Sequence, residues 1–117
     1  MTDKHTLAHV SADLLGVGSG ALRDSSLLSG LLIAAAGAAG MSAVGAPMVH
    51  AAANGNLSAI LVVEPGHMSV HSFPAAGTAL VDIIAKDEAS AGKALDVFVR
   101  RLAPASAESE SRTRGPR

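Results

Sequence analysis

Five segments of the chain show the pattern of β-strands, with apolar residues at every second position or in a short continuous run. These segments are residues 8–14, 42–52, 57–63, 67–73 and 78–85. Pro47 interrupts the second segment, which predicts that this strand lies at an edge or a bulge of its sheet. Asn54-Gly55 separates the second segment from the third and is a strong hairpin signal. These two strands are therefore expected to pair antiparallel.

Two further segments repeat their apolar residues every three or four positions, as amphipathic helices do. The first follows Asp24 or Ser25, either of which can cap a helix, and is expected to stop at Gly40. Its predicted buried face consists of Leu27, Leu28, Leu31, Leu32 and Ala35. The second spans about residues 87–102, and its predicted buried face consists of Ala91, Ala94, Leu95, Phe98 and Leu102. The order β-α-β-β-β-β-α predicts an α+β domain, an antiparallel sheet covered on one face by two helices.

Length and composition narrow the possible classes of protein. The chain has 117 residues, which suits one domain, and the pattern assigns that domain to residues 1–103. Residues 104–117 are rich in Ser, Glu and Arg and are predicted to form a disordered polar tail. The net charge of −1 and the two aromatic residues argue against a nucleic-acid-binding surface. Cysteine is absent, which excludes disulfides, thiolate ligands and a cysteine nucleophile.

One uncharged stretch raises the question of a membrane span. Residues 25–50 carry no charge and exceed the roughly 20 residues that cross a bilayer. The stretch contains several glycines and Pro47, and it lacks the flanking basic and aromatic residues of membrane helices. Residues 1–13 include acidic residues and no apolar core, unlike a signal peptide. A cytoplasmic protein that does not enter a membrane is expected.

The polar positions of the strands are the first indication of a functional surface. Alternate side chains of a strand point to opposite faces of its sheet, so the polar residues of each strand share one face. These residues are His9, Ser11 and Asp13 in the first strand, His67, Ser69 and His71 in the fourth, and Asp82 in the fifth. If the helices cover the apolar face, the polar face must meet water, a ligand or a second subunit. A homodimer or larger assembly that packs through this sheet face is expected.

Residues 64–82 carry the most specific pattern in the chain. They read Glu-Pro-Gly-His-Met-Ser-Val-His-Ser-Phe-Pro, followed after a gap by Thr-Ala-Leu-Val-Asp. This segment resembles the active-site segment of the bacterial S-adenosylmethionine decarboxylases, with His67, His71, Pro74 and Asp82 on matching positions. The resemblance extends over about residues 7–102. It includes His-Val-Ser-Ala-Asp-Leu-Leu-Gly at 9–16, Ala-Ala-Gly-Ala-Ala-Gly-Met at 35–41, His50, and Leu-Ser-Ala at 57–59.

The resemblance implies a lyase family of polyamine metabolism, active in spermidine biosynthesis, whose members make a pyruvoyl cofactor. In that family the chain cleaves itself before a serine, and this serine becomes the pyruvoyl group. Gly66 stands at the serine position and has no hydroxyl to attack the preceding carbonyl. The proton-donating cysteine expected near Lys86 is also missing, and Ala75 and Ala52 replace residues that bind the nucleoside. No pyruvoyl group, and no other cofactor, is expected here.

Seven residues remain as candidates for a site. The resemblance and the polar face give His71, His67, Asp82 and Ser69 as candidate catalytic residues, and Phe73, His50 and Gly66 as candidate ligand-binding residues. One hypothesis is a non-catalytic relative that binds an S-adenosylmethionine-like or polyamine-like ligand, or a partner subunit such as a catalytic paralogue. The alternative is a divergent enzyme that uses histidine and aspartate in acid–base chemistry on an adenosylmethionine-derived or amino-acid substrate.

A metal site and a purely structural role stay open for the same residues. His67 and His71 are about 13 Å apart along a strand, too far to bind one ion directly, which leaves His50 with one of them and Asp82. No metal is the favoured prediction. Asp13 and Asp82 could equally be satisfied by backbone amides or by neighbouring histidines.

Overall fold

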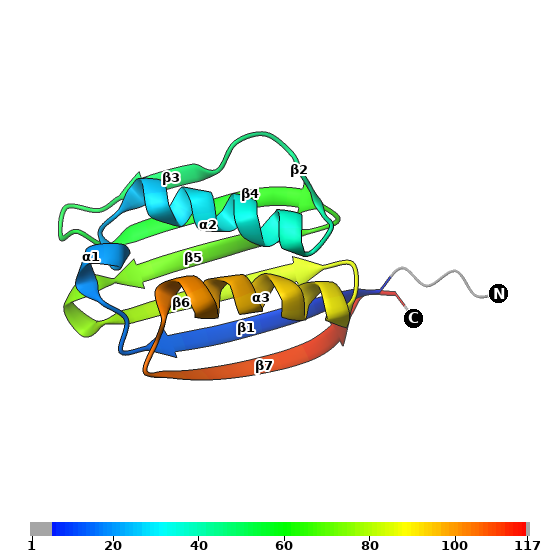
Figure 1. The fold of residues 1–117 in the computed structure, drawn as a ribbon. Coiled ribbons are helices and arrows are strands. Elements are labelled where there is room, and N and C mark those ends of the chain that lie inside the picture. Colours follow the sequence, from blue (N-terminus) through cyan, green and yellow to red (C-terminus); the bar gives the residue numbers. More distant parts are fainter. Residues whose placement is uncertain (1–5, 117) are drawn as a thin grey trace.

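The structure is a computed structural model that describes residues 6–116, a seven-stranded antiparallel sheet with two long helices on one face (Figure 1). The strand order is β2-β4-β5-β6-β1-β7, and β3 pairs with β4 beside β2. The strands are β1 (Leu7–Leu15), β2 (Ser42–Ala43), β3 (Met48–Ala51), β4 (Leu57–Glu64), β5 (His67–Phe73), β6 (Thr78–Ala85) and β7 (Ser106–Arg114). The helices are α1 (Ser19–Leu22), α2 (Ser25–Ala38), α3 (Glu88–Leu102) and a 3-10 turn, η1 (Pro74–Ala76). The predicted α+β class and its antiparallel, one-sided architecture are confirmed.

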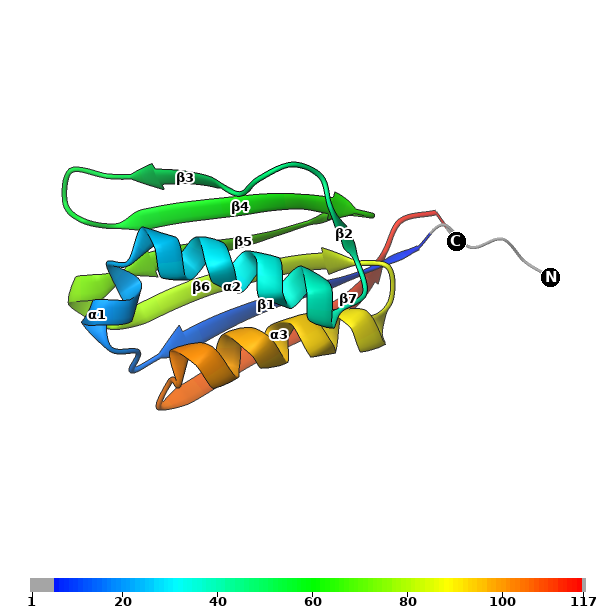
Figure 2. The same cartoon turned by 45° about the horizontal axis from the view of Figure 1, so that its top comes forward.

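The core lies between the sheet and the helices. Helix α2 packs on the half of the sheet that contains β3, β4 and β5, whereas α3 packs on β1 and β6, and the two helices contact each other (Figure 2). Alternate residues of β1, β4, β5 and β6 point toward the helices and are buried, as the period of two predicts. Phe98 of α3 is fully buried in this layer and is the largest side chain of the core.

Both helices begin close to the predicted positions, and an aspartate caps each of them. Asp24 accepts a hydrogen bond from the Leu27 backbone N–H at 3.0 Å, which caps α2, and Asp87 caps α3 in the same way. Gly40, in the left-handed conformation with φ +68°, follows the end of α2. One predicted core position is wrong, because Leu27 is 36% exposed in the first turn of α2. Leu28, the next residue of the predicted face, is fully buried as expected.

One segment is more divided than the pattern predicts. The strand predicted over residues 42–52 is split into β2 and β3 by a bend that contains Pro47. Both pieces pair with β4 at one edge of the sheet, as the proline indicates.

The prediction of a disordered tail is wrong, and so is the domain boundary at residue 103. Strand β7 pairs with β1 along its whole length, from Ser106 opposite Leu15 to Arg114 opposite Leu7. All nine of its residues are exposed, so it buries no apolar side chain that composition could reveal. Without β7, strand β1 would form the edge of the sheet. The backbone hydrogen bonds that β1 makes hold β7 in place. Residues 1–5 and 117 of the predicted domain and tail lie outside the described residues.

None of the helices within residues 6–116 is both long enough and apolar enough to cross a membrane. The uncharged stretch over residues 25–50 forms α2, β2 and β3 instead.

Candidate functional site

The face of the sheet opposite the helices, here called the open face, carries all the polar strand residues that the sequence singles out. Directly opposed residues of antiparallel strands lie on the same face, so the pairing register defines rows across the sheet. The first row runs from β3 to β7 and consists of Met48, Ile60, Ser69, Asp82, Ser11 and Glu110. The second row consists of His50, Ser58, His71, Leu80, Asp13 and Glu108. A third row consists of Val62, His67, Ile84, His9 and Arg112. The candidate residues of the open face therefore divide among neighbouring rows, with Asp82 and Ser69 in the first, His50 and His71 in the second and His67 in the third.

Asp82 lies between two histidines on the open face. The Nε2 atom of His9 is 2.8 Å from Asp82 Oδ1, and the Nε2 atom of His67 is 3.6 Å from Asp82 Oδ2. The three side chains come from β1, β6 and β5, and all are partly exposed. A carboxylate beside imidazoles can orient a ring and accept its proton, which is the geometry of acid–base chemistry.

Arg114 of β7 extends this cluster and fixes the proton on His9. Its Nη1 atom is 3.2 Å from His9 Nδ1. A guanidinium can only donate hydrogen bonds and a carboxylate can only accept them, so Nδ1 of His9 is the acceptor and Nε2 carries the hydrogen. In this arrangement His9 donates to Asp82 through Nε2. The contact also ties the end of the last strand to the site.

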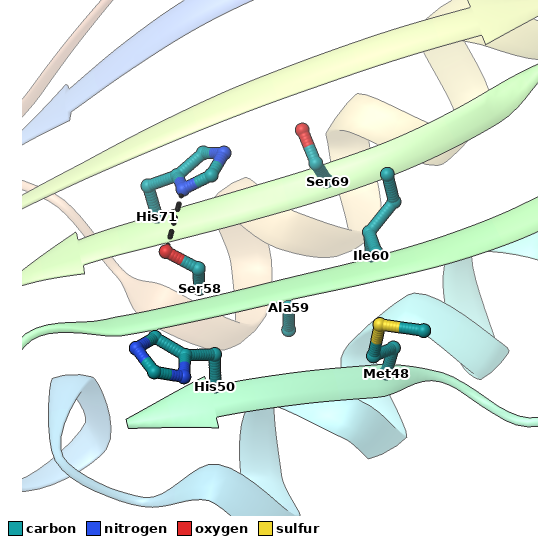
Figure 3. A pocket seen from close by; sticks show the side chains of 7 residues that line it. All are labelled: Met48, His50, Ser58, Ala59, Ile60, Ser69 and His71. Carbon is teal, nitrogen blue, oxygen red and sulfur yellow. Dashed lines mark hydrogen bonds between the residues drawn. The ribbon is translucent and has the colours of Figure 1, made fainter. Parts of the chain in front are cut away.

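A shallow pocket of about 270 Å³ lies beside this cluster, over β3, β4 and β5 (Figure 3). Within it the His71 Nδ1 atom is 2.9 Å from the Ser58 hydroxyl, and His50 projects from the next strand (Figure 3). The residues that line the pocket are Met48, His50, Ser58, Ala59, Ile60, Ser69 and His71. This combination of apolar walls and a few polar groups is typical of a small-molecule site.

Ser69 and Phe73 lie at different depths of the open face. Ser69 is buried in the middle of β5, opposite Ile60 and Asp82, and lines both the pocket and the adjacent hollow around Asp82. Phe73 is the last residue of β5, half-buried and opposite Thr78. It does not line the pocket that contains His50 and His71.

Gly66 occupies the tight turn between β4 and β5. The Val63 N–H donates to the Gly66 carbonyl at 3.1 Å, which leaves Glu64 and Pro65 as the turn residues. Gly66 has φ +109°, a conformation that residues with a side chain rarely adopt. A Cβ atom at this position would overlap the backbone carbonyl oxygen of Ile84 in β6. The turn therefore has no room for a serine in its present conformation.

The structure brings some of the predicted site residues together and separates others. His67 and Asp82 are neighbours, whereas His71 lies in the next row and contacts Ser58 instead. His50 is on β3, which β4 and β5 separate from Asp82 on β6. Within residues 6–116, no three potential ligand side chains are arranged to hold a metal ion.

Three residues of these groups were not among the seven predicted site residues, namely Ser58, His9 and Arg114, and Arg114 lies in the segment predicted to be a disordered tail. Ser58 could have been found from the hairpin, because a turn at Glu64-Pro65 places it opposite His71. His9 was assigned to the polar face but not to the site. Its contact with Asp82 requires β1 to pair with β6, and no local pattern fixes that pairing.

Comparisons with known proteins agree with this architecture. The family model described as S-adenosylmethionine decarboxylase matches residues 8–115. The crystal structure of the adenosylmethionine decarboxylase from Aquifex aeolicus VF5 has the same fold, with a TM-score of 0.88 and 23% sequence identity. The similarity covers 97% of this chain and 94% of that chain. Among curated proteins, none matches this sequence.

Proposed function

We propose that this chain, which belongs to the S-adenosylmethionine decarboxylase family, is a member that does not cleave itself and that acts by binding. Gly66 carries the proposal. It stands where the family resemblance expects the serine that becomes the pyruvoyl group, and it has no hydroxyl. Its conformation and the overlap of any Cβ with Ile84 also leave no space for a serine. The residues present do not fit a pyruvoyl group.

The two other serines of β5 are poor substitutes for the missing one. The Ser72 hydroxyl donates to the Leu22 carbonyl at 2.7 Å and accepts from the Leu57 N–H at 3.2 Å, so it is fully engaged on the covered face. Ser69 lies in mid-strand, paired on both sides. Acyl transfer within a backbone depends on close placement of the attacking group, which regular strand geometry does not provide.

The open face is the surface through which we expect this protein to act. Its pocket offers His50, His71 and Ser58 to a ligand of the S-adenosylmethionine or polyamine class, and Phe73 lies at the end of the same strand as His71. Large apolar side chains are exposed around it, including Met48 at 72% and Val62 at 52%. Such side chains favour a second subunit against this face, either another copy of the chain or a catalytic paralogue.

Intact mass tests the loss of self-cleavage. Freshly expressed protein should be a single chain of about 11.6 kDa, unchanged by S-adenosylmethionine with cyanoborohydride. Two fragments, with a reducible adduct on one of them, would mean that another serine forms the pyruvoyl group. That result would return the protein to the decarboxylases.

Calorimetric titration tests the binding role. We expect S-adenosylmethionine or spermidine to bind, and His71→Ala to weaken that binding about tenfold through loss of one polar contact. Lys93→Ala, on the exposed side of α3, is the control and should bind as the wild type does. Failure of both ligands to bind, alone and with a family decarboxylase present, would contradict the binding proposal.

A second candidate function is a divergent enzyme with acid–base chemistry. The observation that favours it is the carboxylate of Asp82 between His9 and His67. In that case Asp82→Asn should abolish turnover of an adenosylmethionine-derived or amino-acid substrate while the fold persists. Full turnover in this variant would eliminate the candidate.

A further inference from the structure

Strand β7 forms an exposed edge of the sheet. It is the last strand in the sheet order, next to β1, and no other described strand lies on its outer side (Figures 1 and 2). Its nine residues make it much longer than β2 and β3, which share the opposite edge. An edge of this length offers a row of backbone donors and acceptors to another strand.

The charges of β7 are ordered along its length. Glu108, Glu110, Arg112 and Arg114 alternate with small residues and lie on the open face, opposite Asp13, Ser11, His9 and Leu7 of β1. The first half of the strand is therefore acidic and the second half basic. When such a strand is aligned antiparallel with a second copy of itself, the acidic half of each strand lies opposite the basic half of the other.

We propose that two copies of the chain associate edge to edge through β7, antiparallel, with Ser111 of one copy opposite Ser111 of the other. In this register Glu108 faces Arg114 of the second copy, and Glu110 faces Arg112 of the second copy. The two-fold axis repeats both pairs, so every charge on the strand meets its opposite. Cross-strand pairs of opposite charge stabilise a sheet. The result is one continuous sheet across both copies.

The neighbouring registers lack this complementarity. A two-fold axis perpendicular to the sheet keeps the open faces of both copies on the same side, so the register can shift only in steps that preserve the face. A centre at Glu110 places this carboxylate against itself, and a centre at Arg112 does the same with two guanidinium groups. The charge order thus selects one register.

The acidic half of β7 provides a second reason for a partner. Asp13 lies directly opposite Glu108, with Glu110 two residues further along, and like charges at opposed positions destabilise a sheet. Within residues 6–116, none of these three carboxylates forms an ion pair. Arg114 of a second copy would supply the missing positive charge at this corner. Its contact with His9 uses one of five N–H donors, which leaves the others for the partner.

Paired charge reversals test the interface by sedimentation equilibrium. One variant carries Glu108→Arg with Glu110→Arg, and the other carries Arg112→Glu with Arg114→Glu. Each should self-associate about a hundredfold more weakly than the wild type, because all four cross-strand pairs become repulsive. An equimolar mixture of the two should form a heterodimer. The fourfold variant, with all signs exchanged, should recover self-association.

The experiment becomes independent of the proposed binding function when every protein in it also carries the substitution Leu80→Arg. Leu80 is exposed at the centre of the open face, so this substitution blocks association through that face and leaves β7 intact. Lys93→Glu with Arg101→Glu on α3 makes the same charge change elsewhere and should leave edge association unchanged. A monomeric Leu80→Arg protein, unaltered association in either reversed variant, or a mixture that stays monomeric would overturn the proposal.

Discussion

The two faces of the sheet are built from alternate residues of the same strands, yet they differ in what determines them. On the covered face nearly every side chain is apolar and buried, from Leu14 in β1 to Ile83 in β6. On the open face polar groups stand beside exposed apolar ones, such as the Asp82 carboxylate and Val62. Burial of the first face accounts for the fold, because it removes apolar surface from water. The second face is more exposed and contributes less to folding, and the proposed binding role would account for its mixed composition.

The largest expected effect is on the covered face, at Phe98. Phe98→Ala should lower the free energy of unfolding by about 3–5 kcal/mol, because it removes a fully buried ring and leaves a cavity between α3 and the sheet. Chemical denaturation monitored by circular dichroism measures this loss. Leu80→Ala, an open-face substitution, is the comparison and should cost far less. Equal losses would mean that the open face is also part of the core.

The next largest loss of stability is expected at the turn between β4 and β5. Gly66→Ser should destabilise the protein by about 1–3 kcal/mol, from the left-handed backbone and from the overlap of the new side chain with Ile84. We expect no self-cleavage in this variant, because the turn must rearrange before the serine fits. Thermal unfolding and intact mass are the measurements. Gly66→Ala separates the steric cost from any effect of the hydroxyl.

The sequence predicts a feature of these faces well when the feature depends on residues that are close together in the chain. The period of two in β5 places His67 and His71 on the open face and Ser72 on the covered one, because alternation is a local property. Asp24 and Asp87 reveal the starts of both helices for the same reason. Local patterns therefore suffice for the elements and for the polarity of their faces.

Features that depend on distant pairing could not be predicted in the same way. Strand β7 has no apolar side to bury, so its composition resembles that of a disordered tail, and only the free edge of β1 explains it. The His9–Asp82 contact joins residues 73 positions apart and follows from the β1–β6 register. His71 is likewise separated from Asp82 by the β5–β6 register, which places His71 opposite Leu80 and Asp82 opposite Ser69.

A smaller loss of stability is expected from removing serine hydroxyls, and it should differ between the two faces of the sheet. Ser72→Ala should cost about 1–3 kcal/mol, because its hydroxyl is fully buried and satisfies the Leu22 carbonyl and the Leu57 N–H. Ser58→Ala removes an open-face hydroxyl that forms a hydrogen bond with the exposed His71 ring, and it should change stability much less. Urea denaturation of both variants provides the comparison. A greater loss from Ser58→Ala would contradict the division between the faces.

Asp82→Asn should have a still smaller effect on stability, although it changes the centre of the open face. Partly exposed ion pairs contribute about 0–1 kcal/mol, so the free energy of unfolding should fall by less than that. The ring resonances of His9 and His67 should nevertheless shift in NMR spectra, since both lose a carboxylate partner. A loss comparable to that of Phe98→Ala would assign Asp82 to the fold rather than to the open face.

The weakest effect concerns the helix that covers the sheet, and it depends on pH. The Ser90 backbone N–H donates to Asp87 at 2.8 Å, and this bond lowers the pKa of the Asp87 carboxyl below its ordinary value, with help from Lys86 and Lys93. A carboxyl with a lower pKa in the folded state stabilises that state above its unfolded pKa of about 4. The stabilisation is lost as the pH falls through the folded pKa. Asp87→Asn keeps a capping oxygen but cannot ionise, so its deficit in unfolding free energy should be largest near neutral pH and shrink in acid. A deficit that does not change with pH would show that α3 depends on the hydrogen bond alone.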